Sequence, residues 1–207
     1  MIKAVLFDVG GVISTSPFEA FSRYEAERGL PDGFIRKLNA TNPDTNAWAH
    51  LERNDVSFDE FCDLFEAEAR AAGGELKGRE VMECLAGDIR PEMLEAVRRC
   101  HERLKTAMLT NNWRAEDEGG RLDDLLSLFD VVIESSKAGV RKPDPRFYEM
   151  ACAQLEIEPS EAVFLDDLGI NLKPARAMGM TTIKVVDPNA ALDELERAVG
   201  FAVRERR

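Results

Sequence analysis

Short runs of high β propensity recur along the chain, and each run ends in polar or turn residues. They cover residues 2–8, 106–112, 131–136, 162–167 and 181–186. Short apolar runs bounded by turn signals are typical of strands that are buried on both faces of a sheet. The pattern therefore predicts a series of buried strands.

Between these runs the apolar spacing changes to that of helices. Residues 90–104 begin with Pro91 in a first-turn position and place their apolar side chains along one face. Residues 144–155 carry a similar single stripe. Buried strands that alternate with amphipathic helices imply right-handed crossovers and a parallel sheet. We therefore expect a doubly wound, Rossmann-like α/β core, with its site at the carboxyl ends of the strands.

The stretch from residue 14 to about residue 88 breaks this alternation, because it is helical in pattern and contains no convincing strand. Ser57 and Glu60 have the spacing of a capping box, and apolar residues follow at helical intervals. We expect residues 15–88 to form a helical cap inserted after the first strand, and residues 1–14 and 89–207 to form the α/β core. A cap in this place can close over a substrate and exclude water. The alternative is a helical bundle with no part in the chemistry.

Composition and charge restrict the partners. The 207 residues are 44% hydrophobic, enough for a sizeable core, and 27 basic against 39 acidic residues give a net charge of −12. This charge opposes binding to nucleic acid or to an anionic membrane. No apolar run approaches membrane-spanning length, and the one near the N-terminus is too short for a signal peptide. The four cysteines form no C-x-x-C pair, so we expect buried thiols in a cytoplasmic protein with small-molecule or protein partners. The oligomeric state stays open, a homodimer included.

The strand ends carry side chains suited to phosphoryl transfer. Asp8 ends the first run and is followed by Gly10 and Gly11, and Asp166 and Asp167 end the fourth. A carboxylate such as Asp8 can attack phosphorus and form an aspartyl-phosphate, which divides the reaction into two easier displacements. Mg²⁺ held by Asp8, a main-chain carbonyl and Asp167, with Asp166 in support, would neutralise the anionic phosphate.

Three further residues complete this set. Lys142 lies past the third run and would balance the charge shared by Asp8 and the phosphate, while the Thr110 hydroxyl and the Asn111 main-chain N–H would bind phosphate oxygens. Each position also has an ordinary structural explanation: a turn at Asp8, a helix cap at Thr110 and Asn111, a surface lysine, or a capping aspartate pair. Only the ordered set at one sheet edge carries the functional interpretation.

The ordered segments FDVGG, LTNN, KPD and FLDD resemble the four motifs of the haloacid dehalogenase superfamily, and the similarity covers essentially the whole chain. Through LTNNW, IESSKAGVRKPDP and AVFLDDLGINLKPARAMGMTTIKV, the chain is most similar to the N-terminal phosphatase domain of soluble epoxide hydrolases and to a related domain of some acyl-CoA dehydrogenases. The resemblance implies that Asp8 is the nucleophile and a metal ligand, that Gly10 is a metal ligand through its carbonyl, and that Asp167 is a metal ligand. It also implies that Thr110 and Asn111 bind phosphate, that Lys142 balances the charge, and that Asn171 supports the aspartate pair.

The sequence departs from the superfamily pattern at Gly10, where phosphatases of this kind usually have an aspartate that transfers protons. A glycine carbonyl can still bind Mg²⁺, but general acid–base help worth about 10²–10⁴-fold is lost. The leading hypothesis is a Mg²⁺-dependent phosphatase of small organic phosphate monoesters, lipid-like ones included. The alternative is a catalytically weak or inactive module that binds a phosphorylated ligand or a protein; a haloacid dehalogenase ranks third. Trp113, beside the phosphate-binding segment, is a candidate for the substrate pocket.

Overall fold

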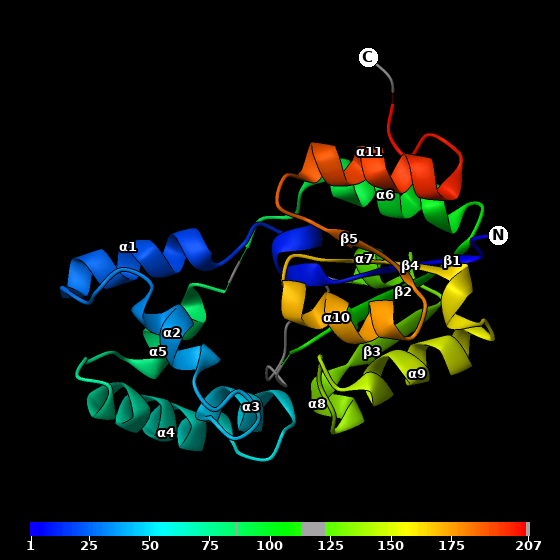
Figure 1. Ribbon diagram of the computed structural model, residues 1–207. Coiled ribbons are helices and arrows are strands. Elements are labelled where there is room, and N and C mark those ends of the chain that lie inside the picture. The colour runs from blue at the N-terminus through cyan, green and yellow to red at the C-terminus, as the bar shows by residue number, and fades with distance from the viewer. Residues whose placement is uncertain (86, 113–122, 206–207) are drawn as a thin grey trace.

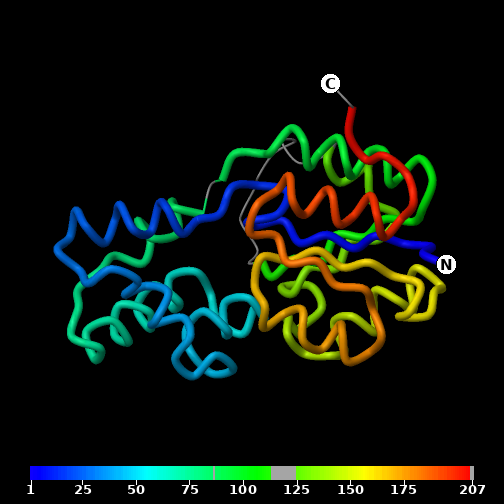
Figure 2. The backbone as a smooth tube through the Cα atoms, turned by 45° about the horizontal axis from the view of Figure 1, so that its top comes forward, coloured from blue at the N-terminus to red at the C-terminus, as the bar shows by residue number. Residues whose placement is uncertain are grey.

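The computed structural model of the protein describes residues 1–85, 87–112 and 123–205, so Trp113 lies outside the described residues. In these ranges the chain forms an α/β core and a group of helices, α1–α5, that follows the first strand (Figures 1 and 2). We call α1–α5 the cap. The domain boundaries at residues 14/15 and 88/89 stay a prediction.

The core is built on a parallel five-stranded sheet in the order β3–β2–β1–β4–β5. The strands are β1 (Ala4–Phe7), β2 (Lys105–Thr110), β3 (Val131–Glu134), β4 (Ala162–Asp166) and β5 (Thr181–Lys184). Each strand falls within or overlaps one of the predicted runs. Most of the polar residues that end these runs lie at or just beyond the carboxyl ends of the strands. The doubly wound α/β fold expected from the sequence is confirmed.

Helices cover both faces of the sheet (Figure 1). One face is covered by α6 (Pro91–His101), α7 (Asp123–Leu126) and α11 (Pro188–Val199), and the other by α9 (Pro145–Leu155) and α10 (Gly169–Ala177). Val5 and Phe7 of β1 join the first apolar cluster, whereas Ala4 and Leu6 join the second. All four side chains are fully buried, because successive residues of a strand point to opposite faces and both faces are covered.

The cap has an apolar cluster of its own. Its helices are α1 (Phe18–Arg28), α2 (Phe34–Ala40), α3 (Ala47–Glu52), α4 (Phe58–Ala71) and α5 (Gly78–Glu83). The predicted capping box begins α4: Ser57 Oγ accepts from Glu60 N, and Glu60 Oε2 accepts from Ser57 N at 2.8 Å. At the centre of the cap the rings of Phe61 and Phe65 stack with centroids 5.3 Å apart.

Two neighbouring chain segments join the cap to the core. Ser14 and Ile89 form an antiparallel bridge, and the Thr15 N–H donates to the Asp88 carbonyl at 2.9 Å. On the core side of this bridge, the Arg90 N–H donates to the Ile13 carbonyl at 2.8 Å. We call this pair of segments the hinge. The hinge segment that contains Ser14 follows shortly after β1 in the sequence, so the cap is attached beside the carboxyl edge of the sheet.

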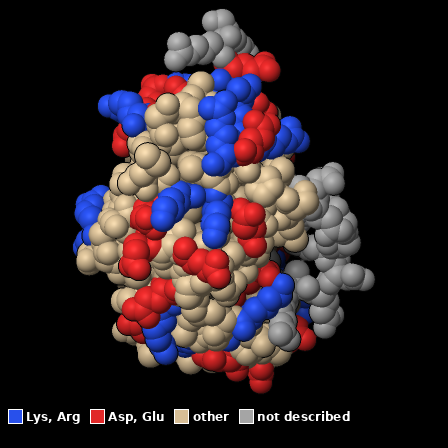
Figure 3. Space-filling view, turned by 90° about the vertical axis from the view of Figure 1, so that its right-hand side faces the viewer, with Lys and Arg blue, Asp and Glu red and all other residues tan. Residues whose placement is uncertain are grey.

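The surface and the cysteines add little to the choice of function. None of the described helices has the length and apolar character needed to cross a bilayer. On the face shown in Figure 3, basic and acidic side chains are interspersed.

Three cysteines are buried as expected. Cys84 is half-buried, because it lies at the edge of the apolar cluster of the cap, so the expectation of a buried thiol is wrong for Cys84.

Candidate active site

Asp8 lies directly after β1, at the carboxyl edge of the sheet. Its main-chain N–H donates to the Leu165 carbonyl of β4 at 2.9 Å, which extends the strand pairing by one residue. Its Oδ1 accepts from the Val9 N–H at 2.7 Å and so caps the turn η1 (Val9–Ile13). The side chain is buried, and backbone contacts on both sides fix its position.

Lys142 brings the separate strand ends together electrostatically. Its side chain is 1% exposed, and its Nζ lies 2.8 Å from Asp8 Oδ1 and 2.8 Å from Asp166 Oδ2. A buried ammonium is stable only when it is paired in this way. The Asn111 side chain holds the same residue from the end of β2, because its Nδ2 donates to the Lys142 carbonyl at 3.0 Å and its Oδ1 accepts from the Lys142 N–H at 2.8 Å. Sequence reasoning assigned only the main-chain N–H of Asn111 and missed this contact.

Asp166 is fully buried and is held by protein donors. Its Oδ1 accepts from the Leu168 N–H at 2.8 Å, and Asn171 Nδ2 lies 3.1 Å from both carboxylate oxygens. Asn171 is fixed in turn by the Tyr148 hydroxyl, which donates to the Asn171 carbonyl at 2.7 Å. The structure therefore brings Asn171 and Asp166 together where the sequence predicted them.

Asp167 differs from Asp166, because no described side chain donates to its carboxylate. Carboxylate oxygens of Asp8, Asp166 and Asp167 lie within 4.8 Å of one another. Hard oxygen donors in such a cluster suit Mg²⁺. Since the oxygens of Asp166 are occupied by Lys142, Leu168 and Asn171, Asp167 is the better placed of the pair to face a cation.

The charges of the cluster do not cancel. Burial raises the pKa of Asp8; the Lys142 ammonium lowers it in part, and the Asp166 carboxylate raises it further. Burial, followed by the charge of Asp166, raises the pKa of Asp167 to about 6. Burial lowers the pKa of Lys142, but Asp166 and Asp8 outweigh it, so that pKa lies above its ordinary value. Three carboxyl groups thus share one ammonium, and a divalent cation would favour the ionised forms of Asp8 and Asp167.

Gly10 and Gly11 have different reasons for being glycine. Gly11 has φ +75°, and a Cβ built there would overlap the carboxylate of Asp167. Gly10 has φ −65° and ψ 124°, which any residue adopts, and nothing lies within 4 Å of the position of a Cβ. The turn therefore requires glycine at position 11 but has room for a side chain at position 10.

The profile of the haloacid dehalogenase-like hydrolases matches residues 2–179. The chain belongs to this family. The expected resemblance is thereby confirmed, and the charged edge described above is the place where the structure brings the segments FDVGG, LTNN, KPD and FLDD together.

Relatives in the haloacid dehalogenase-like family include parts of larger proteins. The chain is 34% identical to acyl-CoA dehydrogenase family member 10 of Mus musculus and 31% identical to bifunctional epoxide hydrolase 2 of Sus scrofa, over 96% of its own length in both cases. It spans only 19% and 39% of these two relatives. A sesquiterpene phosphatase of Aspergillus oryzae is 28% identical and is matched over 97% of its length.

Solved structures of the family share the fold. A haloacid dehalogenase-like hydrolase of Porphyromonas gingivalis matches with a TM-score of 0.70 at 24% identity, with 100% of both chains covered. A family enzyme of Bacteroides thetaiotaomicron, solved as a magnesium complex, matches with a TM-score of 0.61 at 21% identity over 88% of this chain and 92% of that one. The overall architecture is therefore that of known family members.

The remaining predicted residue, Thr110, is the last residue of β2 and lies at the same edge of the sheet as Asp8, because β2 pairs with β1 in parallel register.

Three charged residues near this edge were not predicted from the sequence. Arg90 donates to the Gly11 carbonyl at 3.0 Å, and its charge lowers the pKa of Asp167 in part. Glu52 of the cap and Arg141 of the core form an ion pair. Only Arg141 had a sequence signal, since it directly precedes the KPD motif.

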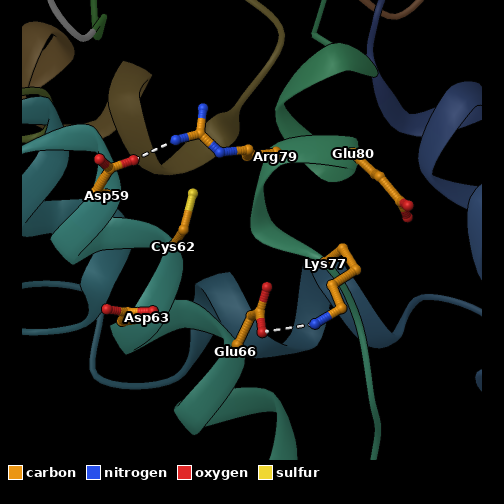
Figure 4. A pocket seen from close by; sticks show the side chains of 7 residues that line it. All are labelled: Asp59, Cys62, Asp63, Glu66, Lys77, Arg79 and Glu80. Atoms are coloured by element: carbon orange, nitrogen blue, oxygen red, sulfur yellow. Dashed lines mark hydrogen bonds and ion pairs between the residues drawn. The ribbon is translucent and has the colours of Figure 1, made fainter.

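A hollow on the cap, between α4 and α5, contains none of the predicted site residues (Figure 4). Its charges are largely paired with one another: Arg79 with Asp59, and Lys77 with Glu66 at 3.3 Å. Because these pairs neutralise each other in an open, solvated hollow, they give no reason to place the reaction there.

Proposed function

We propose that the chain is a Mg²⁺-dependent phosphatase that hydrolyses small organic phosphate monoesters through an aspartyl-phosphate on Asp8. The observation that carries the proposal is the Lys142 ammonium, 2.8 Å from both Asp8 and Asp166, with the Asp167 carboxylate beside them. An anionic phosphate must approach the anionic Asp8, and the two repel each other. The buried Lys142 ammonium, fixed between Asp8 and Asp166, reduces this repulsion.

In the first step an oxygen of Asp8 forms a bond to phosphorus, and the ester oxygen leaves with the electron pair of the broken P–O bond. Asp8 Oδ1 already accepts from Val9 and contacts Lys142, which leaves Oδ2 for this attack. Lys142 balances the charge on Asp8 and the phosphoryl group, while the Thr110 hydroxyl and the Asn111 main-chain N–H bind phosphoryl oxygens. In the second step water attacks phosphorus, the bond between phosphorus and the Asp8 oxygen breaks, and inorganic phosphate, a proton and the free Asp8 carboxylate are released.

Asp8, Asp167 and the Gly10 carbonyl would hold Mg²⁺, which supplies charge neutralisation for the bound phosphate when it is present. Asp166, supported by Asn171, keeps Lys142 in place beside this group. These assignments fit the donor chemistry of the edge, since every ligand offered is an oxygen.

The leaving oxygen must take its proton from water or from a group other than residue 10, since Gly10 has no side chain. Substrates whose leaving groups need little protonation are therefore favoured. The sesquiterpene phosphatase, matched over nearly its whole length, supports phosphate esters of apolar alcohols as a second substrate class, for which water or another group must supply the proton that the leaving alcohol takes up.

Hydrolysis of a generic aryl phosphate with Mg²⁺ tests the proposal, with Asp8→Asn as the matched variant. Asn has the same shape but is no nucleophile, so we expect turnover to fall on the order of 10⁴-fold or more. Equal inactivity of wild type and Asp8→Asn across a broad panel of phosphates would overturn the proposal.

A non-catalytic module that binds a phosphorylated ligand or a protein is the second candidate, and the missing carboxylate at Gly10 favours it. This candidate predicts Mg²⁺-dependent binding of inorganic phosphate without turnover. An aluminium fluoride adduct that forms in the wild type but not in Asp8→Asn would contradict it, because such an adduct imitates the transferring phosphoryl group.

A further inference from the structure

Glu52, the last residue of α3, is a buried carboxylate at the surface where the cap meets the core. Its Oε1 accepts from Trp48 Nε1 at 3.0 Å, and its Oε2 lies 2.5 Å from Nε of Arg141, a core residue. Burial raises the pKa of Glu52, and Arg141 lowers it in part. Neither Glu52 Oε2 nor Arg141 Nε has a well-directed hydrogen bond among the described residues, so each depends on the opposite charge of the other.

The cap holds α3, and hence Glu52, in a fixed place. The Asn46 side chain caps the helix by accepting from the Ala49 N–H at 2.8 Å, and Glu68 Oε1 accepts from the Ala47 N–H at 2.8 Å. The Trp48 ring packs edge-on against the rings of Phe61 and Phe65 at the centre of the cap, with centroid distances of 5.4 and 5.6 Å respectively. Glu52 therefore moves with the cap as a whole.

On the core side, Arg141 has two contacts with the cap and is bonded in sequence to Lys142. Besides Glu52, its guanidinium donates to the Pro43 carbonyl at 2.7 Å. The Lys142 main chain is fixed by Asn111, and the Lys142 ammonium lies between the two buried carboxylates. The Glu52–Arg141 pair is thus one residue away from the cation of the site.

The Glu52–Arg141 pair lies away from the hinge. The hinge joins the chain at Ser14 and Ile89, whereas α3 contacts the short helix α8 (Ser135–Ala138) just before Arg141. Figures 1 and 2 both show α3 beside α8, with the hinge segments leaving the cap elsewhere. The pair is therefore a second attachment, which can form only when the cap lies against the core.

We propose that Glu52 is a positioning residue that the cap supplies to the core. Paired with Arg141, it holds the cap against the core and fixes the backbone before Lys142, so that the ammonium is aligned when the cap is closed. The proposal rests on the proposed function for its kinetic measurement alone, because closure itself can be measured without substrate.

The kinetic experiment uses Glu52→Gln, Arg141→Gln and the double variant, with an aryl phosphate and Mg²⁺. Glutamine at position 52 still accepts from Trp48 but no longer attracts Arg141. Small displacements at a reacting centre can cost about 10²-fold, so we expect kcat to fall about 10- to 100-fold with KM changed less. The double variant loses no more than the worse single variant, because both remove one interaction. Arg141→Lys, which keeps the charge, recovers part of the rate.

Asp55→Asn is the matched control. Its carboxylate pairs with Arg53 at 3.0 Å and lies close to Glu52 in sequence, but its side chain is 43% exposed and forms no hydrogen bond or ion pair with any described residue of the core. We expect kcat within about twofold of wild type. Wild-type kcat in Glu52→Gln, or losses of the two single variants that multiply in the double variant, would overturn the proposal.

A second experiment measures closure without turnover. The chain has two tryptophans, so Trp113→Phe leaves Trp48 as the lone reporter beside Glu52. In that background Arg141→Gln should shift Trp48 emission to longer wavelength and increase its quenching by acrylamide, whereas Asp55→Asn should not. Unchanged quenching in Arg141→Gln would contradict the proposal. If Arg141→Gln changes Trp48 emission and quenching as expected, but the wild-type protein hydrolyses no phosphate, the proposed function is overturned while closure of the cap is supported.

Discussion

The core side and the cap side of the site are held in place in different ways. On the core side, the charged groups stand at strand ends and are fixed by main-chain contacts, as in Asp8 with Leu165 and Lys142 with Asn111. On the cap side, Glu52 is held by helix packing and meets the core through an ion pair. We therefore expect the chemistry to take place at the sheet edge and the cap to determine when that edge is covered.

Gly10→Asp is expected to have the largest effect, and it acts on the core side alone. The backbone at position 10 accepts any residue and has free space at the Cβ position. If proton transfer limits turnover, the new carboxylate should raise kcat for alkyl phosphates by about 10²–10⁴-fold. An aryl phosphate with a good leaving group should gain less, and Gly10→Ala should gain nothing. No gain, with folding and Mg²⁺ binding intact, would mean that another group supplies the proton or that a different step limits.

Lys142→Met tests whether the buried ammonium is the centre of the core side. Removal of one preorganised charge should lower kcat about 10²–10³-fold. It also leaves two buried carboxylates without their cation, so urea titration should show the free energy of unfolding lowered by about 3–5 kcal/mol. Lys137→Met is the control, because Lys137 pairs with Glu134 at an exposed position. An equal loss in both variants would contradict the special role of Lys142.

Phe65→Ala tests whether cap and core are separate units of stability. Phe65 is fully buried and stacks on Phe61, so its truncation should cost about 3–5 kcal/mol. Hydrogen exchange followed by mass spectrometry should show faster exchange in cap peptides and unchanged protection in β1 and β4. Leu64→Ala, at a 43% exposed position, should change neither. Equal loss of protection in β1 and β4 would mean that the two parts unfold together.

Gly11→Ala should have the smallest of these effects and should separate the two glycines of the turn. Its positive φ and the overlap of a Cβ with Asp167 predict a loss of about 1–3 kcal/mol in the free energy of unfolding. Gly10→Ala is the matched variant and should change thermal stability little. A similar loss in Gly10→Ala would contradict the conclusion that position 10 has room for a side chain.

The core side could be predicted from the sequence because parallel strands place their carboxyl ends at one edge. The runs ending in Asp8, Thr110 and Asp166 therefore indicated which residues meet, and the capping box at Ser57 indicated where α4 begins. Glu52 gave no such signal, since an acidic residue at a helix end is ordinarily exposed. Its partner Arg141 is distant in sequence, and no periodic pattern connects two side chains that meet only when the cap packs on the core.

Trapping the acyl phosphate of Asp8 would show whether this residue is the nucleophile. A rapid quench during turnover, followed by borohydride reduction and peptide mass spectrometry, should convert Asp8 to homoserine in the wild type and leave Asp166 and Asp167 unchanged. Turnover that proceeds at the usual rate with Asp8 never reduced, under conditions that trap a known aspartyl-phosphate, would show that Asp8 is not the nucleophile.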